Sequence, residues 1–203
     1  MQGDLCSILG APDCANRISR DQKTGAVSID FDGIDLSKNE GAQLLSDLIS
    51  SGNTYDLSYG SSLQASGRVR NVTFLENLHR KADWRYGKGK TPEDQPRAGV
   101  DGQVAFNWPD ITIKPNPLDP QSVPGSGSSP ALRWTTVFHE LAESYAKVDK
   151  GMQYMDRSNP SVGAHWDAVD RERAMRGQRP YLRLFQFGSG GGTNWQPTTR
   201  MKR

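Results

Sequence analysis

The residue types best suited to chemistry stand together near position 140 of the chain. His139 and Glu143 are four residues apart, and Glu140 directly follows the histidine. On a helix, positions i and i+4 lie on one face about one turn apart, so His139 and Glu143 can hold one object together. Glu140 is rotated by about 100° from His139, because a helix has about 3.6 residues per turn, and can reach beside that object. The spacing therefore predicts a metal site on a helix, with a carboxylate next to it.

A hydrolytic zinc site needs three protein ligands and an open position for water. His139 and Glu143 provide two ligands, and the only other histidines are His79 and His165. A turn at Gly151 could bring the helix that carries His165 back beside the first helix. The predicted ligand set is therefore His139, Glu143 and His165, which has the two-histidine, one-carboxylate composition of catalytic zinc sites.

Three further residues have predicted roles around this set. Glu140 is the expected general base, which would polarise the metal-activated water and pass its proton to the leaving group. Glu172 lies seven residues after His165, on the same helical face. It is expected to orient a ligand by a hydrogen bond, with replacement of Glu143 as the carboxylate ligand as the alternative. Tyr154 is the candidate donor to the oxyanion of a tetrahedral intermediate.

A structural interpretation of the same residues stays open. Glutamate is a good helix former, so a histidine followed by glutamates on a helix also arises without any function. In that case His139 only packs in the interior. Two features favour the metal site. Val137 and Phe138, directly before His139, are apolar, and Ala164-His165 lies on a helix that is expected to fold back beside the first.

Two helices are expected to position these side chains. Ser129 as N-cap and Pro130 at the first helical position predict the start of the first helix, and Gly151 predicts its end. A second helix is expected from Ser161 to Arg176, closing at Gly177.

Strands and one more helix are expected before this pair. Ser37 and Glu40 have the spacing of a capping box, which predicts a helix that ends near Gly52. Phe74 to Leu78 also fits a helix start. Segments with the character of strands are Val27–Phe31, Thr54–Tyr59, Val69–Leu75 and Val104–Trp108. We therefore expect an α+β fold, with a small, twisted, mainly antiparallel sheet packed against the metal helix and its partner.

The domain organisation follows from composition. Residues 1–24 are polar and predict a loose arm, residues 25–187 a single catalytic domain, and residues 188–203 a flexible tail. Residues 115–130 contain prolines and a Gly-Ser run and are expected to form a loop or lid. Cys6 and Cys14 form either a small disulfide-closed loop or two free thiols.

Charge and hydropathy exclude several partners. The 203-residue chain has a formal net charge of +2, too small to indicate nucleic acid or an anionic membrane, so a metal-dependent nuclease is not favoured. Only 34% of its residues are hydrophobic, and no stretch is apolar for long enough to span a bilayer. The first residues lack the basic and apolar regions of a signal peptide.

The motif residues resemble a known family. Residues 136–145, Thr-Val-Phe-His-Glu-Leu-Ala-Glu-Ser-Tyr, resemble the active-site helix of zincin metallopeptidases, most closely the effector and toxin type with the motif His-Glu-Leu-x-His-Ala-Tyr. Glu143 replaces the second histidine of that motif. Gly163-Ala164-His165 and Arg171-Glu172 resemble the second motif of zincin-like domains at the C-terminal ends of bacterial polymorphic toxins, including those of Rhs type. The resemblance covers roughly residues 104–172.

The resemblance implies a secreted zinc peptidase (Zn²⁺ cofactor) that hydrolyses peptide bonds of a host or competitor protein. His139 would be a ligand and Glu140 the catalytic base, while Glu143, a harder ligand than imidazole, leaves the metal identity open. The expected partners are a protein or peptide substrate and an immunity protein. A bacterial secretion system would deliver the domain without a classical signal peptide. The alternative location is the cytoplasm. The alternative functions are a degenerate zincin-like binding or structural domain and a non-peptidase metal-dependent hydrolase toxin.

Overall fold

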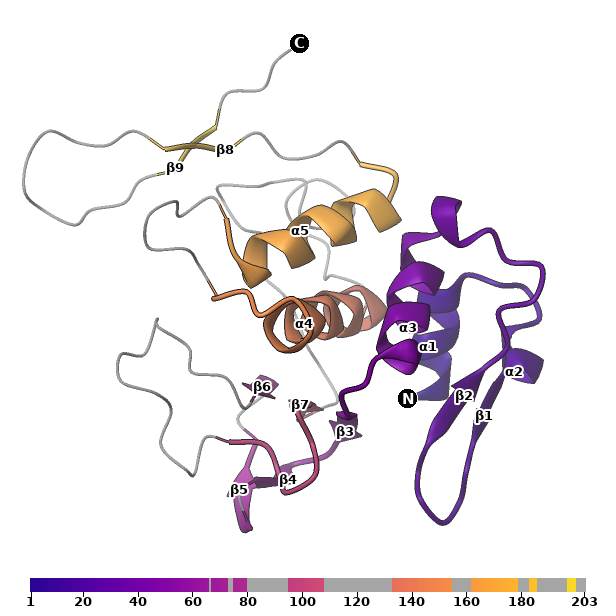
Figure 1. Cartoon of the computed structure of the whole chain (residues 1–203), viewed down its shortest axis with the longest axis vertical. Coiled ribbons are helices and arrows are strands. Elements are labelled where there is room, and N and C mark those ends of the chain that lie inside the picture. Colours follow the sequence, from indigo (N-terminus) through magenta and orange to yellow (C-terminus); the bar gives the residue numbers. More distant parts are fainter. Residues whose placement is uncertain are drawn as a thin grey trace, which may run out of the picture.

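The computed structural model describes most of the chain and places helices beside small sheets (Figure 1). The described residues are 1–65, 67–72, 75–79, 95–107, 133–154 and 162–178, with the backbone of 183–185 and 197–199. The architecture confirms the predicted α+β class. The predictions for the loop at residues 115–130 and for the helix start at Ser129 and Pro130 lie outside the described residues.

The central sheet has three strands, in the order β3 (Tyr55–Tyr59), β7 (Gly102–Phe106) and β6 (Leu75–His79). β7 runs parallel to β3 and antiparallel to β6. Every residue of β7 is buried, as expected for a middle strand covered on both faces. The strand predicted at Thr54–Tyr59 is therefore confirmed, and the strand predicted at Val104–Trp108 is confirmed as far as Phe106, although one of the two pairings in this sheet is parallel.

Two hairpins form separate two-stranded sheets. β1 (Ile18–Arg20) pairs with β2 (Val27–Ile29), and β4 (Ser62–Ala65) pairs with β5 (Arg68–Asn71), both antiparallel. The segment Val69–Leu75, predicted as one strand, is divided between β5 and β6. The helix start considered as an alternative for residues 74–78 is wrong, because β6 pairs with β7 there.

The main helix, α4 (Arg133–Val148), lies between the sheet and α5 (Ala164–Met175) (Figure 1). Its apolar side chains Val137, Phe138 and Leu141 belong to the main hydrophobic core. The sheet approaches α4 closely, since a Cβ on Gly102 would lie 2.5 Å from Oγ of Ser144. Glycine at this position of β7 therefore allows the close packing of strand and helix.

Glycines mark the ends of both helices, as predicted. Gly151, which follows α4, has a φ of 65°, and Gly177, which follows α5, has a φ of 66°. Glycine adopts this left-handed conformation without the steric penalty of a Cβ atom. The second helix begins at Ala164 with Gly163 as N-cap, and its last residues match the prediction.

The N-terminal segment differs from the loose arm expected for residues 1–24. It forms α1 (Gln2–Leu9), α2 (Cys14–Arg17) and β1, and Leu5, Ile8 and Leu9 of α1 lie in the same core as α4. These three apolar residues have helical spacing, which a polar average composition conceals. The disulfide Cys6–Cys14 joins α1 to α2, so the first of the two alternatives for the cysteines is the one observed.

The helix predicted after Ser37 is α3 (Glu40–Ser50), but its cap differs from the prediction. Ser37 lies in a short 3-10 helix, η1 (Leu36–Lys38), and Asn39 is the N-cap of α3. The side-chain oxygen of Asn39 accepts from the backbone N–H of Ala42 at 2.9 Å, and its amide donates to the carbonyl oxygen of Leu9 at 2.9 Å. The side chain of Asn39 therefore both caps α3 and connects it to α1.

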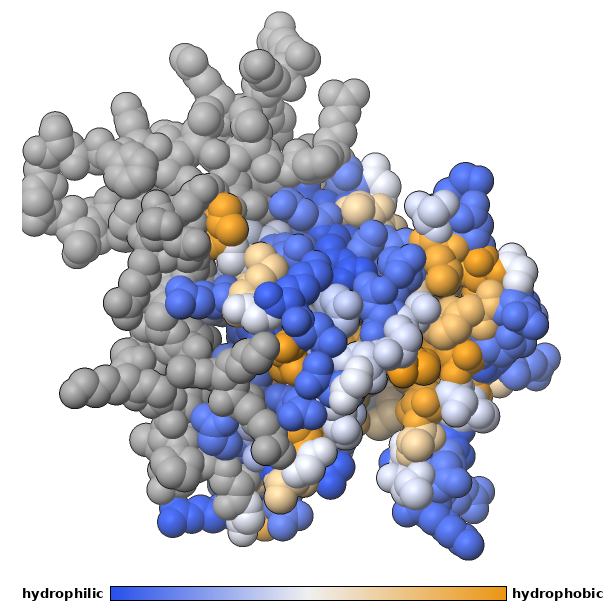
Figure 2. Space-filling view, viewed as in Figure 1, coloured by the Kyte–Doolittle hydropathy of each residue, from blue (hydrophilic) through white to orange (hydrophobic). Residues whose placement is uncertain are grey.

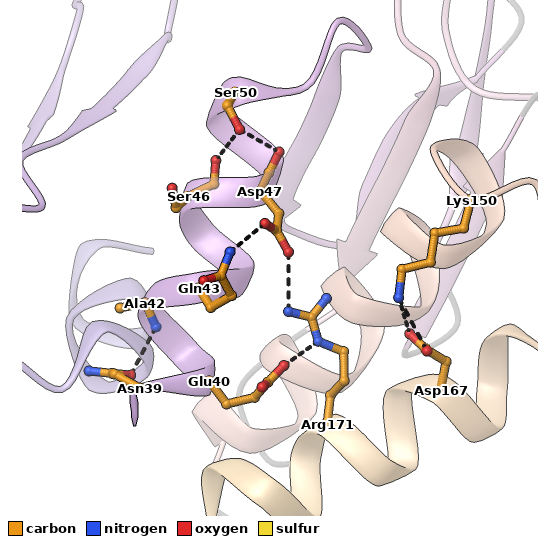
Figure 3. Close-up of polar contacts among 10 residues, drawn as sticks. All are labelled: Asn39, Glu40, Ala42, Gln43, Ser46, Asp47, Ser50, Lys150, Asp167 and Arg171. Carbon is orange, nitrogen blue, oxygen red and sulfur yellow. Dashed lines mark hydrogen bonds and ion pairs between the residues drawn. The ribbon is translucent and has the colours of Figure 1, made fainter. Parts of the chain in front are cut away.

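Arg171 of α5 connects this helix to α3 (Figure 3). Its guanidinium pairs with Glu40 and, at 3.3 Å, with Asp47. The same guanidinium lies 5.9 Å from the ring centre of Tyr145 on α4. Arg171 thus links three helices and helps to fix the position of α5.

The C-terminal region contains a strand pair, β8 (Arg183–Phe185) with β9 (Pro197–Thr199). β8 lies near the end of the predicted domain, residues 25–187. β9 lies within the predicted flexible tail, so part of that prediction is wrong. On the face in Figure 2, polar residues cover most of the centre of the molecule, and apolar ones gather beside α3. Among the described residues, no helix combines the length and the apolarity needed to cross a membrane.

Candidate metal centre

Three potential metal ligands converge between α4 and α5. One ligand atom from each of His139, Glu143 and His165 lies within 4.8 Å of the others. Oε2 of Glu143 is 3.8 Å from Nε2 of His139 and 3.1 Å from Nδ1 of His165. Neighbouring ligand atoms in a tetrahedral zinc site are roughly 3.3 Å apart, given metal–ligand bonds of about 2.0–2.1 Å. The predicted ligand set is therefore brought together and could hold a metal ion.

The connection between the helices places His165 at this point. The backbone N–H groups of Ala164 and His165 donate to the carbonyl oxygens of Gln153 and Tyr154, at 2.8 and 3.2 Å. Ala164 and Ala168 are fully buried, and such small side chains let α5 lie close to α4. His79, the other histidine, is buried in β6 and is not part of the ligand group.

Glu172 lies behind His139. Its Oε2 is 3.0 Å from Nδ1 of His139, whereas Nε2 of that ring faces Glu143. The other oxygen, Oε1, pairs with Arg176 one turn further along α5. A carboxylate on the far nitrogen of a histidine ligand fixes the tautomer and the orientation of the ring. Glu172 therefore has the geometry expected of a residue that orients His139, and it is not part of the ligand group.

The acidic surroundings change the proton affinity of His139. Burial opposes a charge on the imidazole, but the hydrogen bond with Glu172 and the charges of Glu140, Glu172 and Glu143 outweigh burial. Together they raise the pKa of His139 to about 9. The carboxylates around His139 therefore stabilise a positive charge at this point. They would stabilise a bound metal cation in the same way.

Glu143 is shared between the histidines and Lys147, a residue that is not among those predicted for the site. Lys147 donates from Nζ to Oε1 of Glu143 at 2.5 Å, and both side chains are almost fully buried. Burial alone would raise the pKa of Glu143, but the hydrogen bond with His165 and the charge of Lys147 hold it well below its usual range. The i, i+4 spacing of Glu143 and Lys147 is the signal that could have identified this pair in the sequence.

His165 has the opposite tendency to His139. Burial lowers its pKa, and the positive charges of His139 and Lys147 act in the same direction against the hydrogen bond with Glu143. The neutral imidazole is the form that binds a metal. The site therefore favours the ligating form of His165.

Glu140 lies beside the ligands and is held by a residue that sequence reasoning missed. Nδ2 of Asn77, on β6, donates to Oε2 of Glu140 at 2.9 Å and to its main-chain oxygen at 3.1 Å. Burial and the nearby charge of Glu143 raise the pKa of Glu140. No sequence pattern connects Asn77 with Glu140, because the contact arises only when β6 is packed against α4.

Tyr154 lies at the site, with its ring against a ligand. The rings of Tyr154 and His165 are stacked, with centroids 5.2 Å apart and an interplanar angle of 28°. Nζ of Lys147 lies 5.2 Å from the centre of the same ring. The observed contacts of Tyr154 thus support His165 and Lys147, and its predicted donation to an oxyanion stays a prediction.

No protein-family model, no curated protein and no solved structure matches this chain. The resemblance of the motif residues to zincin metallopeptidases therefore stays a hypothesis. The geometry of the ligand group and of its neighbours is the observation on which a function can be argued.

Proposed function

We propose that the protein is a metal-dependent hydrolase, and more narrowly a zinc peptidase of the bacterial toxin or effector type. The observation that carries the proposal is the convergence of His139, Glu143 and His165 from two helices, with Glu172 on the far nitrogen of His139. A structural ion network has no need of two imidazoles directed at one carboxylate oxygen. The toxin context rests on the motif resemblance alone.

Zinc is the ion that best fits this donor set. Two imidazoles and one carboxylate are the ligand composition of catalytic zinc, and three protein ligands leave a position open for water. When bound, the ion supplies Lewis-acid activation of that water and of the scissile carbonyl group. The protein contributes the placement of the ligands and of the proton acceptor.

Glu140 is the proposed proton acceptor. Asn77 donates to Oε2 of Glu140, so Oε1 is the oxygen available to the attacking water. Oε1 would take a proton from the water and pass it to the nitrogen of the leaving amine, so that the C–N bond breaks without expelling an amide anion. Burial and the charge of Glu143 raise the pKa of Glu140, which makes this carboxylate a better base.

Metal content is the test of this proposal. We expect about one zinc per chain in the wild type by elemental analysis, and much less in His165→Ala. Asp167→Asn is the matched control, because Asp167 lies two residues away on the same helix but pairs with Lys150 at the surface. The control should retain zinc. A wild type that holds no metal after zinc is supplied would contradict the proposal.

A structural domain is the second candidate, and the pair Lys147–Glu143 is the observation that favours it. An ammonium group on one oxygen of Glu143 already neutralises part of the charge that a metal would neutralise. In this candidate the helices carry a buried ion network and bind no metal. The same elemental analysis separates the two candidates, since only the hydrolase needs the ion.

A further inference from the structure

Lys147 occupies one oxygen of a proposed metal ligand from within the protein interior. The residue is only 3% exposed, although lysine is rarely buried unless it is paired. Its Nζ lies 2.5 Å from Oε1 of Glu143, while Oε2 of the same carboxylate faces His165 and His139. The two oxygens of Glu143 are therefore assigned to different partners.

Glu172 repeats this arrangement. Arg176, also four residues further along the helix, pairs with Oε1 of Glu172, and Oε2 faces His139. In both cases a cation one turn later on the same helix holds one oxygen and leaves the other for an imidazole. The repeat on two different helices indicates that the division of each carboxylate is a property of the site.

Lys147 is also linked to His165, through the ring of Tyr154. Its ammonium lies over the ring of Tyr154, and that ring stacks on His165. A cation over an aromatic ring and a ring–ring stack each restrict the side chains involved. Lys147 therefore influences Glu143 directly and His165 through Tyr154.

We propose that Lys147 is a positioning residue that limits Glu143 to ligation through one oxygen and thereby sets the metal preference of the site. This inference rests on the proposed metal-dependent function. Four-coordinate zinc needs one oxygen from a carboxylate, whereas Ca²⁺ takes six to eight oxygens, often from bidentate carboxylates, and Mn²⁺ prefers octahedral oxygen sites. With Lys147 on Oε1, Glu143 offers one oxygen, which suits the first class of ion better than the second.

The local charge acts in the same direction. Glu140, Glu143 and Glu172 bring three carboxyl groups to the site, and Lys147 and Arg176 place a cation against two of them. A hard cation depends on uncompensated carboxylates, whereas zinc gains much of its affinity from imidazole nitrogen. Removal of Lys147 frees one oxygen and adds one net negative charge, and both changes favour ions that bind more oxygens.

The test uses Co²⁺ as a spectroscopic substitute for zinc in the 203-residue chain. Co²⁺ in a four-coordinate site absorbs visible light much more strongly than Co²⁺ in a six-coordinate site. The variant is Lys147→Met, and the control is Lys150→Met, which removes the same charge from a partly exposed lysine that pairs with Asp167. We expect the strong band in the wild type and the control, a several-fold weaker band in Lys147→Met, and a gain of Mn²⁺ and Ca²⁺ binding in that variant alone.

Two results would overturn the inference. One is a Lys147→Met spectrum and metal preference that coincide with those of Lys150→Met, which would make Lys147 a structural ion pair only. The other is a six-coordinate spectrum in the wild type itself. This second measurement needs no variant, so the inference can be contradicted even if Lys147→Met does not fold.

The proposed function can fail separately. Four-coordinate Co²⁺ binding in the wild type, altered in Lys147→Met but without any peptide cleavage, would support the inference and contradict only the peptidase. A wild type that binds no metal would contradict both. Cleavage with zinc bound, and no effect of Lys147→Met on the Co²⁺ spectrum, would contradict only the role of Lys147.

Discussion

The two faces of α5 carry clusters built from the same charged residue types, but the clusters differ in burial and in partners. On one face, Arg171 and Lys150 pair with carboxylates of α3 and α5 (Figure 3). The other face of α5 packs against α4, where the side chains of Lys147 and Glu143 are 4% and 5% exposed, against 39% and 25% for Lys150 and Asp167. The buried cluster also contains two histidines.

This difference has an energetic meaning. Exposed ion pairs contribute about 0–1 kcal/mol, and buried ones are often no better than apolar residues of the same size, because the charges lose their hydration. A buried network of three carboxylates, two cations and two histidines is therefore poorly explained by stability. The cluster of Arg171 and Lys150 joins helices, whereas the cluster of Lys147 and Glu143 is organised around a position where imidazole and carboxylate atoms meet. We infer that the first is structural and the second functional.

The strongest test of this distinction is the proposed base. In Glu140→Gln we expect zinc to be retained and peptide cleavage to fall by about 10²- to 10⁴-fold, the usual contribution of general acid–base catalysis. The measurement is cleavage of a mixed peptide library, followed by mass spectrometry, with Asp167→Asn as control. Full activity of Glu140→Gln would show that the base has been wrongly assigned.

Removal of the metal should affect stability next most strongly. If free zinc is at about 1,000 times its dissociation constant, chelation should lower the free energy of unfolding by about 4 kcal/mol, because the ion binds only the folded chain. Urea denaturation with and without a chelator measures this. His165→Ala should not respond to the chelator, and an equal response in both proteins would place the ion elsewhere.

A change in the cluster that joins α3 and α5 should give the opposite pattern. Arg171→Met removes the pairs with Glu40 and Asp47, and its side chain is only 12% exposed. We expect a loss of about 1.5–3 kcal/mol in the free energy of unfolding, typical of hydrogen bonds to charged groups, with zinc content unchanged. Loss of zinc from a protein that is otherwise folded would show that this face of α5 also controls the site.

The smallest effect is expected at Lys150. Its pair with Asp167 is partly exposed, so Lys150→Met should change the free energy of unfolding by less than about 1 kcal/mol and leave zinc content unaltered. Denaturation and elemental analysis of the same sample measure both. An effect as large as that of Arg171→Met would contradict the expectation that the more exposed pair of Lys150 contributes less than the pairs of Arg171.

Local patterns in the sequence were sufficient for the features that depend on near neighbours. The spacing of His139 and Glu143 placed both on one helical face, and Gly151 and Gly177 marked the helix ends. Alternation of apolar residues predicted the central strand β7. These features depend on the periodicity of helices and strands over a few neighbouring residues, and this periodicity can be recognised in the sequence itself.

Contacts between distant residues could not be read in this way. Asn77 meets Glu140 across 63 positions, and Arg171 meets Glu40 across 131. The helix α1 was missed because its three core residues stand among polar ones, and they are buried only when α3 and α4 are packed against them. Of the two states considered for Cys6 and Cys14, the packing of α1 beside α2 decided in favour of the disulfide.

The sequence by itself determined the ligand types and which of them share a helix. Only the tertiary structure decided that His165 completes the group, that Glu172 lies behind His139, and that Lys147 divides the oxygens of Glu143. The physical reason is that helical periodicity fixes directions around one axis, whereas the distance between two helices depends on the side chains packed between them.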